Sequence, residues 1–275
     1  MTTLARPAPA TPPVGQLLRE WRERRRISQL DLSIQADIST RHLSFVETGR
    51  SRPTPGMILR LSEQLDVPLR ERNALLLAGG YAPAYPEHSL DEPELTRLRS
   101  ALRQILTGHE PYPALVVNRW WEMLDGNAAV AMLIEGCDPA LLTPPLNVLR
   151  VSLHPDGMAP RIANLPEWRA HILERLHRQV QATRDARLAE LHAELASYPG
   201  GVAERPGLTD VAVPLRLRHG ARELAFFSMT AVVGAPLDVT VAEVAIESFY
   251  PSDAETAEAL HAIGVSERAD ARAAR

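Results

Sequence analysis

Apolar residues in the first eighty positions recur at intervals of three and four, within short segments that turn residues separate. This spacing is typical of amphipathic helices that each bury one face. Thr54 and Pro55, for example, provide an N-cap and a first-turn proline. The pattern predicts five short helices: one over Val14–Arg25, two between Ser28 and Gly49, one over Gly56–Leu65 and one over Leu69–Ala78.

The stretch from Ser28 to Gly49 predicts two helices joined by a tight turn. Ser28 and Ser39 cap the helices, Asp37 and Ile38 make the turn, and Gly49 suits a left-handed C-terminus. We expect one buried face on the first helix from Leu30, Leu32, Ile34 and Ala36, and on the second from Leu43, Phe45 and Val46. Such a pair can place its second helix in the major groove of DNA.

A proline-bearing connector, Tyr81–Asp91, precedes a region of mixed strand and helix patterns. The predicted helices are Glu92–Leu106, one from Ala128 with Asn127 as cap, Trp168–Ser197 with a break near Thr183-Arg184-Asp185, and Ala254–Ile263 with Ser252 and Glu255 as a capping box. The predicted strands are Ala114–Val117, Trp120–Leu124, Val148–Leu153, Leu208–Arg218, Glu223–Val233 and Val239–Phe249, the fourth and fifth joined at His219-Gly220. Such an order is typical of an α+β domain with an antiparallel sheet.

These patterns predict two domains. We expect a disordered leader over residues 1–13, a helix-turn-helix domain over 14–80, a linker over 81–91, an α+β domain over 92–265 and a flexible tail over 266–275. No apolar run reaches the ~18 residues of a membrane span, and the leader lacks the apolar core of a secretory signal. The single cysteine, Cys137, excludes an internal disulfide and a thiolate-rich metal site, which favours a cytoplasmic location.

Charge is distributed unevenly along the 275 residues. Residues 14–80 contain 11 arginines against 8 acidic residues, a balance of +3, whereas the whole chain carries −4. All basic residues are arginine, which suits bidentate contact with phosphate and guanine. A basic first part on an acidic remainder indicates that only the first part meets a polyanion.

Three strings in the first part resemble the DNA-binding domain of the Cro/phage-repressor (XRE) family: SQ at Ser28-Gln29, STRHLSFVETGRSRP from Ser39, and ERNALLLAGGYAP from Glu71. The resemblance implies double-stranded DNA as partner, base readout by Thr40, Arg41 and Ser44, and phosphate contacts by Gln29, Ser39, Arg50 and Arg52. His42 is open between a phosphate contact and a solvated face. Asp37 stands in the turn where the family usually has glycine. Asp tolerates the left-handed backbone conformation better than most residues, so we expect the motif to remain intact. The alternative is a five-helix domain that binds protein.

Four strings further on resemble the PAS-like ligand-binding domain of MmyB-type transcription regulators: PALVVNRWWEML from Pro113, GNAAVAML from Gly126, NVLRVSLHPDG from Asn147 and VTVAEVAIESFYPSDAETA from Val239. The resemblance implies an α+β PAS-like domain with a small molecule between sheet and helices, such as a fatty acid or acyl compound. By that analogy and by strand alternation, the pocket residues are Trp121, Met123, Met132, His154, Phe226 and Ser228. The alternative is that these residues are simply core.

Signals for catalysis and for cofactors are absent from the sequence. No GxSxG, Walker, HExxH or dinucleotide motif occurs, and the six-residue step from His171 to His177 puts the two rings on different helix faces. We therefore expect no enzyme, no cofactor and no metal. The favoured function is a homodimeric, ligand-controlled transcription regulator. A DNA-binding protein whose second domain only dimerises or docks another protein, and an enzyme fused to a DNA-binding module, are the alternatives.

Overall fold

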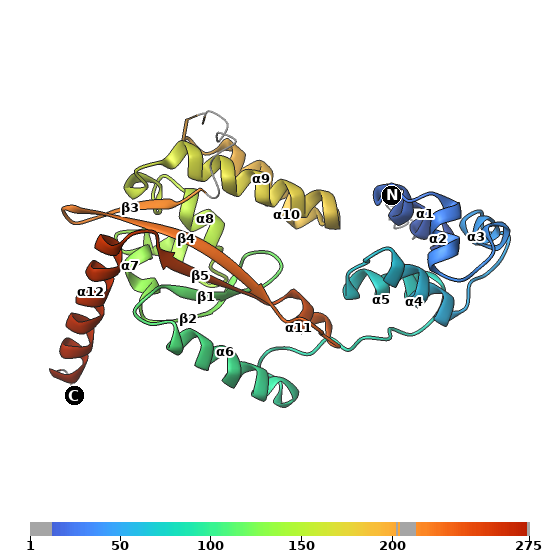
Figure 1. The fold of residues 1–275 in the computed structure, drawn as a ribbon, viewed down its shortest axis with the longest axis horizontal. Helices are drawn as coiled ribbons and strands as arrows, with labels where there is room; N and C mark the ends of the chain where they lie inside the picture. Colours follow the sequence, from blue (N-terminus) through green and yellow to red (C-terminus); the bar gives the residue numbers. More distant parts are fainter. Residues whose placement is uncertain (1–12, 202, 204–212, 274–275) are drawn as a thin grey trace, which may run out of the picture. The chain divides into compact units, whose positions relative to one another are not determined.

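The computed structural model describes residues 13–201, 203 and 213–273. The chain divides into two compact units, and each is described by itself. The first comprises the described residues up to His88 together with Ala235–Ala242; the second comprises Ser89–Gly234 and the chain from Glu243 onward. Figure 1 labels the helices and strands of both units.

The first unit contains the five helices that the sequence predicts. They are α1 (Val14–Arg24), α2 (Gln29–Gln35), α3 (Thr40–Glu47), α4 (Pro55–Gln64) and α5 (Leu69–Ala78). Their inward faces form one core, whose most deeply buried members are Leu18, Leu32, Ala36, Leu43, Val46, Ile58, Leu61, Leu65, Val67, Leu75 and Leu76. The predicted all-α class of the first domain is confirmed.

Local hydrogen bonds start three of these helices where the sequence places the caps. The side-chain oxygens of Ser28, Ser39 and Thr54 accept from the backbone N–H of Asp31, His42 and Met57 respectively. Gly49 ends α3 with φ +73°, and Asp37 in the turn has φ +51°. A side chain at Gly15 would place its Cβ 2.0 Å from the Val46 carbonyl oxygen, so glycine is what lets α1 approach α3.

One sequence expectation about α2 is wrong. Leu30 and Ile34 are 58% and 70% exposed, whereas Leu32 and Ala36 are buried. Four apolar residues spaced by two cannot share one face of a helix, because each step of two turns the side chain by about 200°. The stripe with Leu32 and Ala36 faces the core, and the stripe with Leu30 and Ile34 faces solvent.

The second unit is built on a five-stranded antiparallel sheet of order β2-β1-β5-β4-β3. The strands are β1 (Ala114–Val117), β2 (Met123–Gly126), β3 (Leu215–His219), β4 (Arg222–Val232) and β5 (Ala245–Pro251). The helices are α6 (Thr96–Gly108), α7 (Val130–Ile134), α8 (Val148–Leu153), α9 (Leu165–Thr183), α10 (Ala186–Ser197) and α12 (Ala254–Ala273), with short 3-10 turns at Pro93–Leu95, Pro139–Leu142 and Ala159–Arg161. The predicted α+β class with an antiparallel sheet is confirmed.

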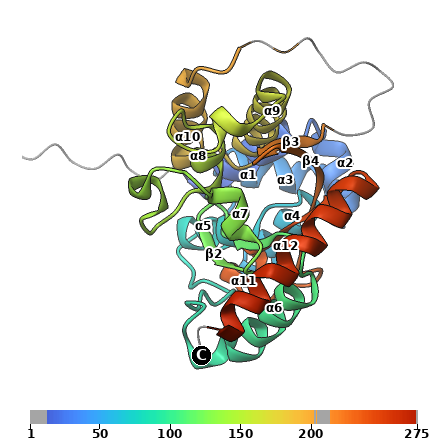
Figure 2. The same cartoon turned by 90° about the vertical axis from the view of Figure 1, so that its left-hand side faces the viewer.

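The two faces of this sheet are covered by different helices. Val116 and Ile246 pack against α6, whereas Leu115 and Val117, which alternate with Val116 along β1, belong to the main core with α7, α8 and α9. Figure 2 shows α8, α9 and α10 gathered at the top and α6 at the bottom. The larger core therefore lies between the sheet and α7–α9.

Two segments that the sequence assigns to strands are helical. Val148–Leu153 forms α8, because the Asn147 side chain accepts from the Arg150 N–H at 3.0 Å and caps it. Val239–Glu243 forms α11, where the Asp238 carboxylate accepts from the Val241 N–H at 3.1 Å, so β5 begins only at Ala245. Short apolar runs suit either structure, and the cap residue decides.

Other predicted boundaries shift because polar side chains act elsewhere. Strand β2 begins at Met123, because the Asn118 side chain accepts from two backbone N–H groups and holds Trp120–Glu122 in a turn. The Asn127 side chain bridges the Ala114 N–H and the Leu106 and Tyr112 carbonyls, and α7 begins at Val130. Asp253, rather than Ser252, caps α12, which runs to Ala273.

The predicted interruption of the long helix is confirmed. Arg184 has φ +54° and ends α9, and Asp185 then caps α10 by accepting from the backbone of Arg187 and Leu188. The hairpin joining β3 to β4 turns at Gly220, with φ +58°, as expected. The first part of the predicted strand Leu208–Arg218, residues 208–212, lies outside the described residues.

Candidate functional sites

Helix α3 is held against α1 by a buried ion pair. Arg22 donates from Nε and Nη2 to the two carboxylate oxygens of Glu47, at 2.7 and 2.9 Å. The Glu47 side chain is 1% exposed, and it also accepts from Gln29 Nε2 at 2.7 Å. The pair fixes the C-terminal end of α3 and draws the first residue of α2 to the same carboxylate.

The N-terminal end of α3 is joined to α2 through two hydroxyl groups. The Oγ1 of Thr40 lies 2.8 Å from the Oγ of Ser33, which is buried and also donates to the Leu30 carbonyl. The Thr40 hydroxyl thus already has a partner, so we assign it to positioning α3, with its methyl group left as the part that could touch a base.

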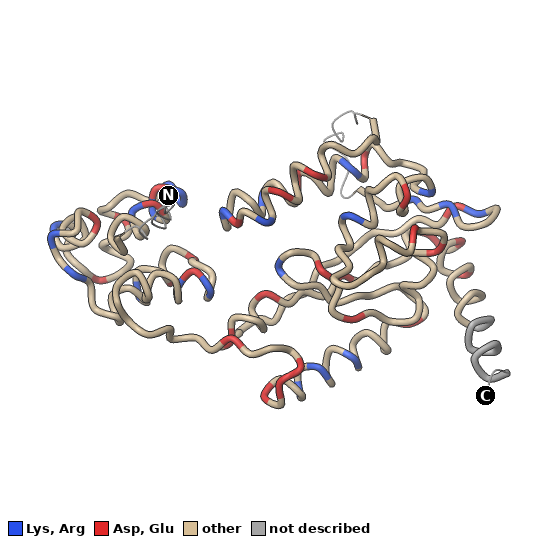
Figure 3. The backbone as a smooth tube through the Cα atoms, turned by 180° about the vertical axis from the view of Figure 1, so that it is seen from behind, with Lys and Arg blue, Asp and Glu red and all other residues tan. Residues whose placement is uncertain are grey.

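Beyond these contacts, α3 and the turn after it present a basic face that is arranged around Phe45. The guanidinium of Arg41 lies 5.3 Å from the centre of the Phe45 ring, and that of Arg50 lies 5.9 Å from it. Both arginines are exposed, and Ser44 lies half-buried between them in sequence. These distances are within the range of cation–π contacts, so one ring attracts both guanidinium groups. Figure 3 marks the basic segments of this unit in blue.

The other predicted phosphate contacts differ in how many hydrogen bonds their side chains already make within the protein. Ser39 is exposed and caps α3. Gln29 gives one amide hydrogen to Glu47, which leaves the second available. Arg52 donates to the Gly79 carbonyl at 2.8 Å and lies over the Tyr81 ring, so part of its role is to hold the end of α5.

The second unit contains a cavity of about 70 Å³ between the sheet and α7, α8 and α9. Its wall is mostly aliphatic and aromatic. The cavity is smaller than a typical ligand pocket, whose volume is roughly 300–1,000 Å³. A ligand of ordinary size would fit only if the wall moved outward, and the wall includes Met123 and Met158, whose side chains adapt readily.

A charged pair lies at one edge of this cavity. The Nη2 of Arg175, on α9, donates to the carboxylate of Glu247, on β5, and to Thr230 Oγ1 at 2.6 Å. Thr230 also donates to Glu247 at 2.7 Å. The side chain of Glu247 is 6% exposed and that of Arg175 is 26% exposed, so the pair lies at the boundary between the apolar wall and solvent.

Trp121 closes the cavity beside this pair. Its backbone has φ +66°, an unusual conformation for a bulky residue, and its carbonyl accepts from the Val148 N–H at 2.9 Å. The guanidinium of Arg175 lies 4.3 Å from the centre of the Trp121 ring, and the Trp121 indole N–H donates to Gln179 at 2.8 Å. Trp121 is therefore held by contacts from α8 and α9 at once.

Only half of the predicted pocket residues line this cavity. Trp121, Met123 and Ser228 do. Met132 and Phe226 are buried in the surrounding core, and His154 packs edge-on against Tyr198 with its Nδ1 accepting from the Asp156 N–H. The sequence prediction missed Arg175, Glu247, His171 and Trp168, which come from α9 and β5.

His171 supplies a neutral polar group to the wall. It stacks on Trp168 with ring centres 5.5 Å apart, and the Trp168 indole donates to Ser152 at 3.0 Å. Burial, followed by the positive charge of Arg175, lowers the pKa of His171. Its imidazole is therefore uncharged at neutral pH and can donate or accept a hydrogen bond.

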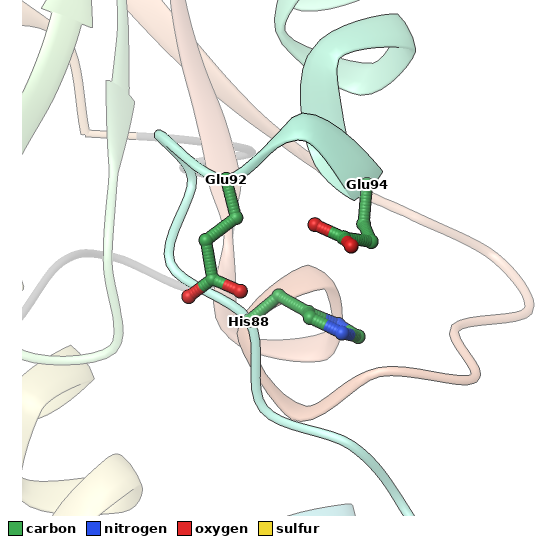
Figure 4. Close-up of side chains that lie close together, drawn as sticks. All are labelled: His88, Glu92 and Glu94. Carbon is green, nitrogen blue, oxygen red and sulfur yellow. The ribbon is translucent and has the colours of Figure 1, made fainter.

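Among the residues that the structure describes, one group has ligand atoms close enough for a metal ion. His88, Glu92 and Glu94 belong to a single stretch of chain, and these atoms lie within 4.8 Å of one another (Figure 4). However, His88 Nδ1 lies 2.7 Å from the Asp238 carboxylate, and Glu92 accepts from the Ser89 N–H at 2.8 Å. These bonds explain the grouping without an ion, and we assign no metal to it.

Comparison with known proteins places both units. The profile of the family described as "MmyB-like transcription regulator ligand binding domain" matches residues 98–263, which include every residue that lines the cavity. The chain belongs to this MmyB-like family. The profile of a helix-turn-helix domain matches residues 13–75, which include α1 to α4 and the exposed face of α3. Both resemblances drawn from the sequence are confirmed.

A curated relative matches part of the chain. It is an uncharacterised HTH-type transcriptional regulator, RghRB, of Bacillus subtilis, which is 37% identical over 76 residues. The match covers 27% of this chain and 52% of the relative, so the chain spans about half of that protein's length. In the described part of the chain, no helix combines the length and the apolar character that crossing a bilayer would require.

Proposed function

We propose that this MmyB-like chain is a sequence-specific DNA-binding transcription regulator whose DNA affinity depends on a small molecule in the cavity of its second unit. The observation that carries the proposal is the exposed basic face formed by α3 and the turn after it, where Arg41 and Arg50 lie over the Phe45 ring. The buried Arg22–Glu47 pair and the Ser33–Thr40 bond fix both ends of that helix.

Arg41 and Ser44 are the base readers in this proposal. Arginine can donate two hydrogen bonds to the O6 and N7 atoms of guanine, and serine can bond to several bases. Ser39, Gln29, Arg50 and Arg52 contact phosphates, which sets the position of α3 without selecting a sequence. Since Arg52 also binds the Gly79 carbonyl, we expect Arg50 to contribute more to the salt dependence.

A homodimer follows from the small reach of one recognition helix. A single α3 contacts only a few base pairs, so specific binding uses two copies on half-sites about 34–36 Å apart. Selection of duplexes from a random pool with the full chain tests this step. We expect enriched inverted repeats with half-sites about one helical turn apart; enrichment of single short sites, or of nothing, would contradict it.

Two observations support control by a ligand: the cavity in the second unit and the match of that unit to a family of ligand-binding domains. A ligand changes DNA affinity only if it binds two states of the protein differently. In this proposal, ligand binding expands the cavity beyond its volume of about 70 Å³, and Trp121, whose backbone is strained, is the element that the ligand displaces. Trp121→Ala is expected to abolish a ligand-induced change in DNA affinity while DNA binding itself persists.

The small volume also favours a second candidate function. A second unit that only dimerises or docks a protein would have a closed core, and about 70 Å³ is close to that condition. Native mass spectrometry of protein from its own host separates the two candidates. A retained small molecule supports ligand control, whereas a dimer of bare chain mass supports the second candidate.

A further inference from the structure

The formal charges around the cavity cancel. Of the described residues that line it, Arg175 and Glu247 carry opposite charges at neutral pH, and they bind each other. His171 is held in the neutral form by its surroundings. The remaining polar side-chain groups in the wall are uncharged: the hydroxyls of Ser152 and Ser228, and the indole N–H groups of Trp121 and Trp168, which donate to Gln179 and Ser152. A ligand therefore meets an apolar wall with a compensated charge pair at one edge.

The mutual neutralisation of Arg175 and Glu247 determines which ligand head group the cavity can accept. A ligand carboxylate beside Arg175 would place two carboxylates on one guanidinium, because Glu247 is already there and almost fully buried. Burying one net charge is costly unless the group is neutralised or paired. A ligand ammonium beside Glu247 meets the same difficulty with Arg175. An uncharged oxygen adds a hydrogen bond and no net charge.

We propose that the cavity selects an uncharged amphipathic ligand, with an apolar body and one hydroxyl or carbonyl oxygen, over fatty acids and amines of equal length. The inference rests on the proposed ligand control and specifies its chemistry. An uncharged ligand differs from the fatty acid that the family resemblance of the sequence implied.

The donors for such an oxygen are present at the charged edge. The bonds of Arg175 to Glu247 and Thr230 leave from the same nitrogen, Nη2. A guanidinium carries five N–H donors, so the side chain can also serve a neutral acceptor. The hydroxyl of Ser228 and the neutral imidazole of His171 line the same cavity and can bond to a ligand hydroxyl.

The test uses three probes of one chain length: octan-1-ol, octanoate and octylamine. Their binding to the full chain near neutral pH is followed by tryptophan fluorescence, since Trp121 and Trp168 line the cavity. For the wild type we expect octan-1-ol to bind about tenfold more tightly than either charged probe, as expected when the pair leaves no uncompensated charge.

Variants that unbalance the pair should move the preference in opposite directions. Glu247→Gln leaves Arg175 uncompensated and is expected to raise octanoate affinity about tenfold, while Arg175→Gln should raise octylamine affinity by a similar factor. Glu223→Gln removes one carboxylate from an exposed pair with Arg216 on the same sheet and is expected to leave all three affinities unchanged. Thermal melts verify that each variant is folded.

The outcomes separate this inference from the proposal on which it rests. Wild-type protein that binds octanoate as tightly as octan-1-ol, or an unchanged preference in a folded Glu247→Gln variant, would overturn the neutral-ligand inference and leave ligand control standing. Failure of all three probes to bind the wild type would also overturn the neutral-ligand inference, while ligand control is decided separately by the molecule that native mass spectrometry finds retained. The wild-type comparison requires no variant to fold.

Discussion

The replacement Glu47→Ala removes one partner of the ion pair that fixes α3. In the wild type the Glu47 carboxylate accepts two bonds from Arg22 and one from Gln29, and its side chain is 1% exposed. The variant leaves the buried Arg22 with its bond to the Ile27 carbonyl and, as its remaining carboxylate, the exposed Glu23 at 3.8 Å. Breaking a buried pair in this way costs about 3–5 kcal/mol.

That cost is large against the stability of so small a unit. Domains have a free energy of unfolding of about 0.05–0.15 kcal/mol per residue, or roughly 3–10 kcal/mol for about 65 residues. We therefore expect the variant to lose most of the protection that folding gives to the first unit. The DNA affinity of the full chain should fall with it, because α3 loses its fixed position.

Hydrogen exchange of the full chain, read by mass spectrometry on peptides from α1 and α3, measures this loss locally. Peptides from the second unit serve as an internal reference. Glu63→Ala is the matched control, because it removes an exposed glutamate of α4 in the same unit. An apolar replacement of both partners, Arg22→Met with Glu47→Leu, should recover part of the protection. If peptides from Glu47→Ala exchange like those of the Glu63→Ala control, the assigned role of the pair is refuted.

Three further predictions concern the reading face and the charge networks. Arg41→Ala should cost about 1–3 kcal/mol on the selected duplex and relax the preference at one base position; an equal loss on scrambled DNA would remove Arg41 from the readers. Arg50→Ala should weaken binding to all sequences and reduce the slope of log affinity against log salt by about one, and an unchanged slope would count against a phosphate contact. A hydrogen bond from Arg150 lowers the pKa of Glu194 below its ordinary value of 4.5, so this pair adds stability above that pH and loses it as the pH falls through the folded-state value. Melting temperatures measured against pH should therefore fall less on acidification in Glu194→Gln than in the wild type. An identical fall in the two proteins would refute the contribution of this pair.

Features that depend on neighbouring residues were predictable from the sequence. The caps at Ser28, Ser39 and Thr54 act within three residues, and Gly49 acts on its own backbone. The break at Arg184-Asp185 is equally local. The errors at Val148–Leu153 and Val239–Glu243 have a local cause as well, because Asn147 and Asp238 are caps that outweigh an apolar run.

The charged edge of the cavity could not be found in this way. Arg175 and Glu247 are 72 residues apart, and their pairing depends on how α9 packs across β5. Alternation along β4 correctly places Ser228 on the face that lines the cavity, but it selects Phe226 as well. Periodicity predicts which face of the sheet a side chain lies on, and it does not predict whether that side chain reaches the cavity or is buried in the core beside it. Phe45 was expected in the core; its spacing of four from Arg41 is the signal that could have placed it under the arginines.

The central claim is that DNA binding responds to the contents of the cavity. The most direct measurement compares DNA affinity between protein as purified from its own host and the same protein after small molecules are extracted, with fluorescence anisotropy on the selected duplex. We predict a difference of about fivefold or more in the wild type and none in Trp121→Ala. Equal affinities of the two wild-type preparations, with a retained molecule seen by native mass spectrometry only before extraction, would contradict the account.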